Sequence, residues 1–419
     1  MKENKTKPDI RFKGFTDDWE QRKLGEIVGI YDGVHQTPKY QDSGIMFLSV
    51  ENISTLQSTK YISEEDFKRD YKVYPQENDI LMTRIGDVGT TNVVTDNTLK
   101  AYYVSLALLK YKNTNPYFLS NAMQSNYVQK GLANRTLKTA VPMKINKDEI
   151  GKVDVILTAA VEEQSKIGSY FKNLDNLITL HQRECNQLKE LKKTMLKKMF
   201  PRDGSNIPEV RFAGFTDDWE QRKLSEVLIS LQNNTLSRVN LMSETGVAKN
   251  VHYGDVLIKF GDILDVSKEK LPMISDESIL KKYKASFLQN GDVIVADTAE
   301  DSSVGKCSEI IGLNDEIVLS GLHTIPYRPV EKFASGYLGY YLNSSAYHNQ
   351  LIPLMQGIKV MSISKSAMQN TYIIYPKLEE EQAKIGQYFS QLDNLITLHQ
   401  RELEILKNLK KTCLKRMFI

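Results

Sequence analysis

The residue types that carry out catalysis or hold cofactors occur in this chain without the spacing that such chemistry requires. Gly305 and Lys306 resemble the end of a phosphate-binding loop, but Cys307 follows where that loop has Ser or Thr, and Glu300 stands at the position of its first glycine. The two glycines of Ile85–Gly89 are more typical of a tight turn. The sequence therefore predicts no bound nucleotide cofactor.

The sequence also lacks the motifs for metal binding and for methyl transfer. The cysteines Cys185, Cys307 and Cys413 form no Cys-x-x-Cys pair for a zinc site. The carboxylates Glu300 and Asp301 are better explained by a surface loop than by a nuclease metal site. None of the twelve prolines is next to another, so the Pro-Pro loop with which adenine methyltransferases grip a base is absent. We expect no catalytic, cofactor-binding or metal-binding residues.

The composition limits the class of protein further. The 419 residues carry a net charge of +3, which excludes a histone-like polycation but not DNA binding, because local clustering of charge matters more than the sum. No run approaches the roughly 18 apolar residues of a membrane span, and the first residues lack the apolar stretch of a secretion signal. These features predict a cytoplasmic protein.

The chain contains two copies of one plan. The short segment 11–26 recurs at 211–226 with two differences, and the long segment 162–200 recurs at 380–418 with about three quarters of its positions identical. The segments between them look unrelated. The repeats are nearly identical, whereas the segments between them have diverged. This pattern favours a common frame that carries two different binding units. A recent duplication followed by random divergence is the less favoured alternative.

We therefore divide the chain into six parts by residue number. They are a short repeat (1–26), a first variable segment (27–158), a long repeat (159–200), a linker with the second short repeat (201–226), a second variable segment (227–376) and a second long repeat (377–419).

Each long repeat has the periodicity of a coiled-coil helix. Apolar residues recur at alternating steps of four and three, which is typical of a left-handed seam. Two histidines on the seam are better explained as polar residues that set the register than as a metal pair or a pH switch. The predicted seam residues are Ile167, Phe171, Leu174, Ile178, His181, Leu188 and Met195, and in the second helix Ile385, Phe389, Leu392, Ile396, His399, Leu403 and Leu406.

Basic residues gather near the end of each predicted helix. Lys192 and Lys410 fall on the seam itself, and we expect them to extend their ammonium groups to solvent. The other basic residues could meet phosphate or a partner, but a solvated helix face explains them at least as well. They are Lys189, Lys193, Lys197 and Lys198, and Lys407, Lys411, Lys415 and Arg416.

The linker predicts the direction of the second helix. About ten residues join the first helix to the second short repeat, and at ~3.5 Å per residue they do not reach back along a helix of ~60 Å. The second helix can then bury its seam only by running antiparallel to the first. A seam from Ile167 to Met199 would span ~50 Å, or about 15 base pairs of DNA.

Both variable segments are predicted to be strand-rich and mixed with helices. Strands are expected at 44–50, 79–85, 102–111, 152–157, 255–260, 292–297, 316–327 and 371–376, and helices at 116–134 and 335–356. The predicted fold class is α+β, with two strand-rich domains at opposite ends of an antiparallel two-helix coiled coil and a pseudo-two-fold internal repeat. The polar loops between the strands would form the binding surface.

The order of these features resembles the specificity subunit of type I restriction-modification systems over nearly the whole chain. No one of the motifs is specific alone, but their order, repeated twice, is. They are WEQRKL from Trp19 and Trp219, GVHQTP from Gly33, the strand-loops at Asn78 and Gly291, VPMKINKDEI from Val141, SGLHTIPYRP from Ser320, and EEQ-x-KIG from Glu162 and Glu380.

The resemblance implies a protein with no catalytic activity of its own. Each variable segment would be a target recognition domain for one half of a bipartite, asymmetric site in double-stranded DNA. The coiled coil would hold two modification subunits, which bind S-adenosylmethionine and methylate adenine, and restriction subunits, which use ATP and Mg²⁺. The cofactors would then bind to the partners and not to this chain. The alternative is a two-headed coiled-coil scaffold whose variable segments bind proteins.

Candidate DNA-binding residues follow from the chemistry of the major groove, where Arg or Lys pairs with guanine and Asn or Gln with adenine. Phosphate contact is as good an interpretation as base contact for each lysine. The candidates are His35, Gln36, Lys39, Tyr40, Arg84, Lys138, Thr139 and Lys144 in the first variable segment, and Gln232, Asn233, Asn234, Arg238, Lys306, His323, Gln356 and Lys359 in the second.

Overall fold

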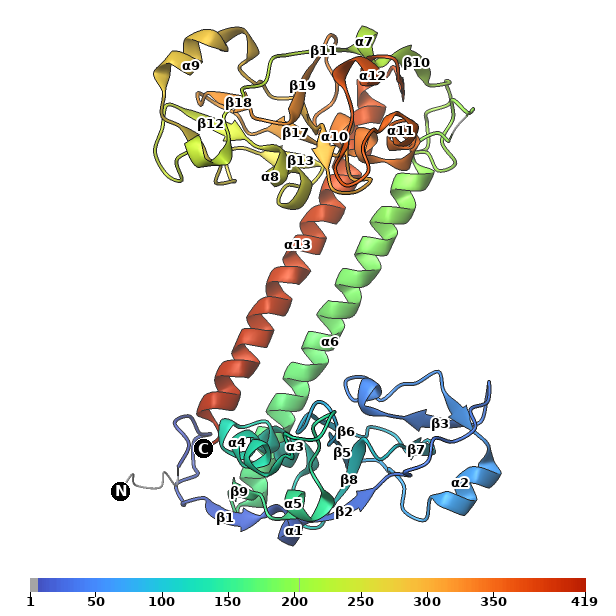
Figure 1. Cartoon of the computed structure of the whole chain (residues 1–419), viewed down its shortest axis with the longest axis vertical. Helices are drawn as coiled ribbons and strands as arrows, with labels where there is room; N and C mark the ends of the chain where they lie inside the picture. Colours follow the sequence, from blue (N-terminus) through green and yellow to red (C-terminus); the bar gives the residue numbers. More distant parts are fainter. Residues whose placement is uncertain (1–6, 203) are drawn as a thin grey trace. The chain divides into compact units, whose positions relative to one another are not determined.

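The computed structural model describes residues 7–202 and 204–419, and the chain forms two compact units. Unit 1 consists of the chain up to Arg183 together with Gln400–Ile419, and unit 2 is Glu184–His399. The long helices α6 (Val161–Lys198) and α13 (Glu379–Arg416) each contribute one part to unit 1 and the other part to unit 2. Figure 1 labels most of the helices and strands of both units.

Unit 1 is built around a four-stranded sheet with the order β2-β8-β5-β6. A three-stranded sheet has the order β4-β3-β7, and β1 pairs with β9. The bounds are β1 (Glu20–Lys23), α1 (Leu24–Ile27), β2 (Val28–Asp32), β3 (Ile45–Leu48), β4 (Tyr61–Ile62), α2 (Glu64–Asp70), β5 (Ile80–Thr83), β6 (Thr91–Val93), β7 (Lys100–Tyr102), β8 (Leu106–Tyr111), α3 (Pro116–Met123), α4 (Asn126–Arg135), α5 (Lys147–Gly151) and β9 (Asp154–Leu157).

Unit 2 repeats this topology although its variable segment is unrelated in sequence. Its sheets have the orders β11-β19-β15-β17-β13, β14-β12-β18, β10-β21 and β16-β20. The bounds are β10 (Glu220–Lys223), α7 (Leu224–Val227), β11 (Leu228–Ser230), β12 (Ala248–Val251), α8 (Tyr253–Ile258), β13 (Ile263–Asp265), β14 (Met273–Ile274), α9 (Glu277–Lys282), β15 (Val293–Ala296), β16 (Thr298–Ala299), β17 (Cys307–Ile311), β18 (Val318–Ser320), β19 (Thr324–Pro329), α10 (Tyr337–Asn343), α11 (Ser345–His348), β20 (Met361–Ser362), α12 (Lys365–Gln369) and β21 (Tyr372–Tyr375).

Each strand pair of unit 1 has a counterpart in unit 2, and unit 2 adds the pairs β13–β17 and β16–β20. The antiparallel pairs β2–β8 and β5–β8 of unit 1 match β11–β19 and β15–β19 of unit 2. The parallel pair β3–β7 matches β12–β18. The predicted α+β class and internal repeat are therefore confirmed, and the two divergent segments share one topology.

A buried ion pair joins each short repeat to the start of a long helix. The guanidinium of Arg11 donates from Nε and Nη2 to the two oxygens of Glu163, at 2.5 and 2.9 Å. Arg211 makes the same two bonds to Glu381, at 2.6 and 2.9 Å. The Glu163 and Glu381 side chains are 0% and 1% exposed, so each carboxylate depends on its arginine for compensation of its charge.

An aromatic cluster completes this frame in each unit. In unit 1 the ring of Trp19 lies 5.6 Å from that of Phe118, and Phe171 of α6 lies 5.7 Å from Phe418, just after α13. All four side chains are buried in one core. The short repeat, a variable-segment helix and both long helices thus share that core. The equivalent cluster of unit 2 contains Trp219, Tyr337, Phe389 and Phe200.

The parts of the long helices within unit 1 run antiparallel. The hydroxyl of Tyr170 lies 3.5 Å from Sγ of Cys413, and further along α6 the carboxylate of Asp175 pairs with Lys410. The contact therefore advances along α6 as it goes back along α13. This agrees with the direction predicted from the linker.

The same direction is found in unit 2, where Glu184 pairs with His399 and, further along α6, Lys192 pairs with Asp393.

The prediction that the seam lysines extend to solvent is wrong. The ammonium of Lys192 lies 2.7 Å from Asp262 and 2.6 Å from Asp393, and its side chain is 16% exposed. Lys410 is its equivalent in the second repeat and pairs with the equivalent aspartate, Asp175. These lysines neutralise carboxylates beside the seam and do not extend into solvent, because burial without a partner would be costly.

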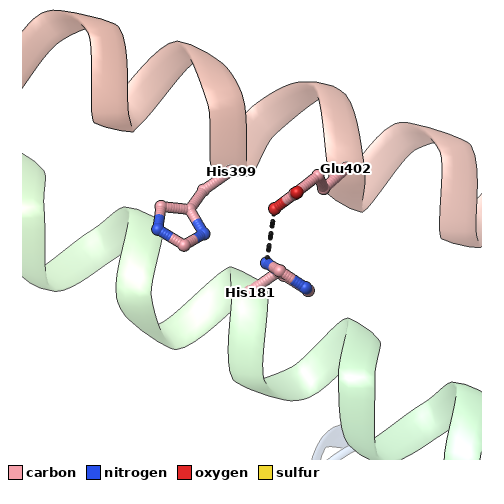
Figure 2. A group of neighbouring side chains, drawn as sticks. All are labelled: His181, His399 and Glu402. Atoms are coloured by element: carbon pink, nitrogen blue, oxygen red, sulfur yellow. Dashed lines mark ion pairs between the residues drawn. The ribbon is translucent and has the colours of Figure 1, made fainter.

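Every residue predicted to lie on the seam is buried or half-buried. The histidines on it also have defined partners. In unit 1, Nδ1 of His181 lies 3.2 Å from the carboxylate of Glu402, as Figure 2 shows. In unit 2, His399 makes the equivalent contact with Glu184 at 3.3 Å.

One expected strand is wrong and two others are divided. Residues 255–260 belong to α8 and its end, not to a strand, because the imidazole of His252 accepts the N–H of Gly254 and starts a helix there. The expected strand 102–111 is split into the end of β7 and β8, and 316–327 into β18 and β19. His323, with φ of 56°, forms the turn between the latter two. Among the described residues, no helix is long and apolar enough to span a membrane.

The Arg11–Glu163 pair should make unit 1 sensitive to acid. Burial acts to raise the pKa of Glu163, but the hydrogen bonds of Arg11 and Thr158 and the charge of Arg11 together outweigh it and hold that pKa below its ordinary value. The stability it contributes is present above about pH 4.5 and is lost as the pH falls through the lowered pKa. We expect Arg11→Met to lower the unfolding free energy by about 3 kcal/mol at pH 7, and by progressively less as the pH falls below about 4.5.

Urea unfolding followed by the fluorescence of Trp19, in a common Trp219→Phe background, measures this effect. Arg22→Met is the matched control, since Arg22 and its partner Glu20 are 56% and 55% exposed. Arg22→Met should lower the unfolding free energy by less than about 0.5 kcal/mol. An equal loss in both variants, or a loss for Arg11→Met that does not change with pH, would contradict the assignment.

Candidate nucleic-acid interface

Three strands of unit 1 bring their loops to one edge of the four-stranded sheet. The register pairs Asp32, the last residue of β2, with Ala107, and Thr83, the last residue of β5, with Leu106. Because β8 begins at Leu106, the loops after β2 and β5 and the loop before β8 all leave the sheet at the same edge. Polar side chains from three distant parts of the sequence are thereby collected on one surface.

A hairpin after α4 joins this edge. The N–H of Leu137 donates to the carbonyl of Lys144 at 2.8 Å, which closes the hairpin. The N–H of Gly86 donates to the carbonyl of Met143, also at 2.8 Å, which fixes the hairpin to the loop after β5. We call the surface made by residues 33–40, 84–90, 103–105 and 137–144 loop edge 1.

Unit 2 has an equivalent surface with different side chains. The register pairs Ser230, the last residue of β11, with Tyr327, and Ala296, the last of β15, with Thr324. The hairpin closed by Gln356 and Ser362 joins the edge through β20, which pairs with β16. We call the surface made by residues 231–240, 297–306, 321–323 and 356–362 loop edge 2.

Most of the predicted DNA-binding residues are exposed on these two edges. Asn233 is half-buried, and its amide donates to the carbonyl of Gly321 at 3.1 Å. The exposed ones are His35, Gln36, Lys39, Tyr40, Lys138, Thr139 and Lys144 on loop edge 1, and Gln232, Arg238, His323, Gln356 and Lys359 on loop edge 2.

Arg84 has a structural role, which corrects the prediction that it reads bases. Its side chain is buried, Nε donates to the carbonyl of Ile145 at 3.1 Å, and Nη1 donates to the carboxylate of Asp32. Burial lowers the pKa of the guanidinium from its ordinary value, although the group stays charged. Arg84 thus connects the base of the hairpin to the end of β2.

Asn234 and Lys306 require the same correction in unit 2. Asn234 is completely buried, and its amide donates to Oδ1 of Asn250 at 2.6 Å and to the carbonyl of Ser320 at 2.8 Å. The ammonium of Lys306 donates to the carbonyls of Leu257 and Phe260, at 2.8 and 3.0 Å. Burial lowers the pKa of Lys306. Lys306 therefore satisfies carbonyl groups at the end of α8, and neither side chain is available to DNA.

Two of the exposed candidates are held in place by carboxylates. Nη1 of Arg238 lies 2.6 Å from Asp255. Nδ1 of His323 lies 3.3 Å from Asp297, and its ring packs edge-on against Tyr253 at 5.3 Å. Preorganisation of this kind lowers the entropy cost of a later contact.

The apolar tips of the two hairpins could not be predicted from the sequence pattern. Val141 is 99% exposed on loop edge 1, and Ile358 is 98% exposed on loop edge 2. Apolar residues are ordinarily predicted to lie in a core, so only the structure identifies these two as surface groups. Lys138 and Lys144 flank the first tip and Lys359 follows the second, so both tips combine apolar and basic character.

Further charged groups line the pockets beside the loops. A pocket beside the 33–39 loop is also lined by Asp66, Arg69 and Asp70. A pocket on loop edge 2 that contains Gln232 and Asn233 is also lined by Lys282 and Lys365, which were not predicted. Within the described ranges, neither loop edge holds three potential metal ligands within reach of one another.

Comparison with known proteins gives a consistent result. The family model described as the type I restriction modification DNA specificity domain matches residues 16–190 and 216–408. The chain is 24% identical to the type I restriction enzyme MjaVIII specificity subunit of Methanocaldococcus jannaschii, over 94% of this chain and 91% of that protein. Its fold is similar to the crystal structure of the type I restriction-modification system S subunit from M. genitalium, with a TM-score of 0.59, 12% identity and 99% of each chain covered.

Asn234 should affect stability rather than recognition. Asn234→Ala removes the donor to the buried Oδ1 of Asn250 and the side-chain donor to the carbonyl of Ser320, which keeps the N–H of residue 234. We therefore expect the unfolding free energy of unit 2 to fall by about 2 kcal/mol. Gln232→Ala, an exposed neighbour, should change it by less than about 0.5 kcal/mol. Urea unfolding followed by Trp219 fluorescence in a Trp19→Phe background distinguishes the two. A negligible effect of Asn234→Ala would contradict the structural role.

Proposed function

The chain belongs to the family of type I restriction-modification DNA specificity proteins, and we propose that it reads a bipartite, asymmetric DNA site without catalysing a reaction itself. The observation that carries this proposal is the pair of loop edges. Both are presented by the same strand pairs on the same frame, yet they expose different side chains. One half-site would be read by each edge, and different side chains imply different half-sites.

The exposed side chains suit contacts with base edges. Gln36, Gln232 and Gln356 could each pair with adenine through two hydrogen bonds, and Arg238 could pair with guanine. The lysines of the hairpins suit phosphate or guanine contacts. A direct pairing of this kind contributes about 1 to 3 kcal/mol of discrimination against the wrong base.

Each unit also offers a surface for a partner protein. In unit 1, Leu177 and Leu180 of α6 and Ile405 and Leu409 of α13 are 42%, 48%, 65% and 40% exposed. Their spacing from the seam places them on one flank of the helix pair, since they occupy the two heptad positions on the same side of it. We name this group apolar flank 1.

Unit 2 carries the equivalent group, Leu191, Leu395 and Leu398, which are 38%, 43% and 50% exposed. Two equivalent flanks support a scaffold for two modification subunits, one on each unit, to which restriction subunits would be added. We propose that S-adenosylmethionine, ATP and Mg²⁺ are bound by those partners and that the complex works in the cytoplasm.

A methylome measures the DNA-reading function directly. Co-expression of this chain with a matching modification subunit, in a host without adenine methylation, should produce methylated adenines in one split, asymmetric motif. Exchange of residues 27–158 for the variable segment of a relative should change one half of that motif and leave the other half unchanged. A palindromic motif, or a change in both halves, would contradict the proposal.

The absence of any motif from a complex that assembles would favour the alternative function. The two variable segments would then bind proteins, and the long helices would serve as a spacer between them. Methylation by the purified chain alone would contradict the non-catalytic role.

Apolar flank 1 should be needed for binding one modification subunit. We expect Leu180→Asp combined with Ile405→Asp to weaken that binding at least tenfold, because a charge replaces buried apolar area at the interface. Mass photometry of the complex should then show the loss of one modification subunit while the second remains on unit 2. Asn176→Asp with Asn408→Asp, exposed changes of equal charge on the same helices, are the control. Loss of both subunits, or of neither, would contradict two independent sites.

A further inference from the structure

A basic pocket in unit 1 lies outside the base-contacting candidates. Its volume is about 310 Å³, and the end of α13 and the start of α4 form its walls. The lining residues are Gln124, Asn126, Ile178, Lys407, Lys410, Lys411, Leu414 and Lys415. No acidic side chain is among them.

Three of its lysines carry charge that the protein does not neutralise. Lys407, Lys411 and Lys415 are four residues apart on one face of α13, and all three are exposed. In the part of the chain that the structure describes, none of them pairs with a carboxylate, whereas Lys410 pairs with Asp175. Like charges at this spacing destabilise a helix, and the helix dipole favours only those in its last turn. An external anion would compensate the remaining charge.

The pocket adjoins loop edge 1 directly. Nε2 of Gln124, a lining residue, donates to the carbonyl of Gly89 in the loop after β5 at 2.9 Å. Gln129 donates to the same carbonyl at 3.0 Å. The ten-residue helix α4 begins at Asn126, so the positive end of its dipole also faces this region. A DNA duplex held on loop edge 1 would therefore have backbone close to these lysines.

The lysines recur in the other long repeat. Lys189, Lys193 and Lys197 occupy the equivalent positions in the part of α6 within unit 2, and none pairs with a carboxylate of the described chain. The neighbouring position is Glu190 in one repeat and Asn408 in the other, so the repeats have diverged between the lysines but kept them. The lysines are common to both units, whereas the loop edges differ. They therefore suit the phosphate backbone, which is the same in every DNA sequence.

A partner protein is a less suitable ligand for this face. On α13, Ile405 and Leu409 of apolar flank 1 lie on one side of the seam, and Lys407 and Lys411 lie on the other side, as their heptad positions require. The surface that suits a protein partner is thus separate from the lysine face.

We propose that Lys407, Lys411 and Lys415, together with the start of α4, bind phosphate groups of the DNA backbone beside the half-site contacted by loop edge 1. This inference rests on the proposed DNA-reading function. The contacts would add affinity without sequence preference, because phosphates carry no base information. Lys189, Lys193 and Lys197 would do the same for unit 2.

The test is a salt titration of DNA binding by the complete complex with its modification subunits. The variant carries Lys407→Gln, Lys411→Gln and Lys415→Gln, and the control carries Lys13→Gln, Lys68→Gln and Lys112→Gln, three exposed lysines of unit 1 that do not line the pocket. The probes are a duplex with the methylated motif and an unrelated duplex of equal length. We expect the triple variant to bind both duplexes about tenfold more weakly, and the slope of log K against log salt to fall by about 2 to 3.

The methylated motif should stay unchanged in the variant, and the control should resemble the wild type. A slope equal to that of the wild type, a change in the motif, or loss of a modification subunit from the complex would overturn the phosphate site. The last of these would indicate a protein partner on the lysine face. Failure of the wild-type complex to prefer its motif duplex would instead overturn the proposed function, and the inference with it.

Discussion

The buried arginine–glutamate pair is the interaction on which the rest of the architecture depends. Glu163 and Glu381 lie at the first turns of the long helices, where an arginine of the short repeat binds both oxygens of each buried carboxylate and compensates its charge. The pair therefore fixes where the short repeat meets the helix. The strand that follows each short repeat, β2 or β11, then enters its sheet from a defined position. The loop edges owe their orientation to this arrangement.

The frame could be predicted from the sequence, and the details of the loop edges could not. Identity between the repeats revealed the common frame. The long helices and their seam could be predicted because a heptad pattern depends only on residues that are close together in the sequence. Lys192 and Arg84 were misjudged for a different reason. Their carboxylate partners, Asp393 and Asp32, are distant in sequence, and the residues around Lys192 and Arg84 do not predict these ion pairs. Residues 255–260 were misjudged because a short apolar run fits a strand or a helix equally well.

The common topology under unrelated sequences explains how one frame can carry two different loop edges. Strand order and register are specified by alternating burial, which many sequences satisfy. The loops beyond Thr83 and Ala296 are free of that constraint and can vary. Arg84 and Asn234 are buried and belong to the structure that supports the loops.

Unit 1 is assembled from two stretches of chain that are far apart in the order of synthesis. Met417 and Phe418 are buried in the core that contains Trp19 and Phe171. A ribosome produces Trp19 about 400 residues before Phe418, so unit 1 remains without part of its core until translation has passed the whole of unit 2. Unit 2, which is one continuous stretch, can complete its own core earlier. A chain interrupted within α13 would therefore leave the aromatic core of unit 1 exposed to chaperones and proteases.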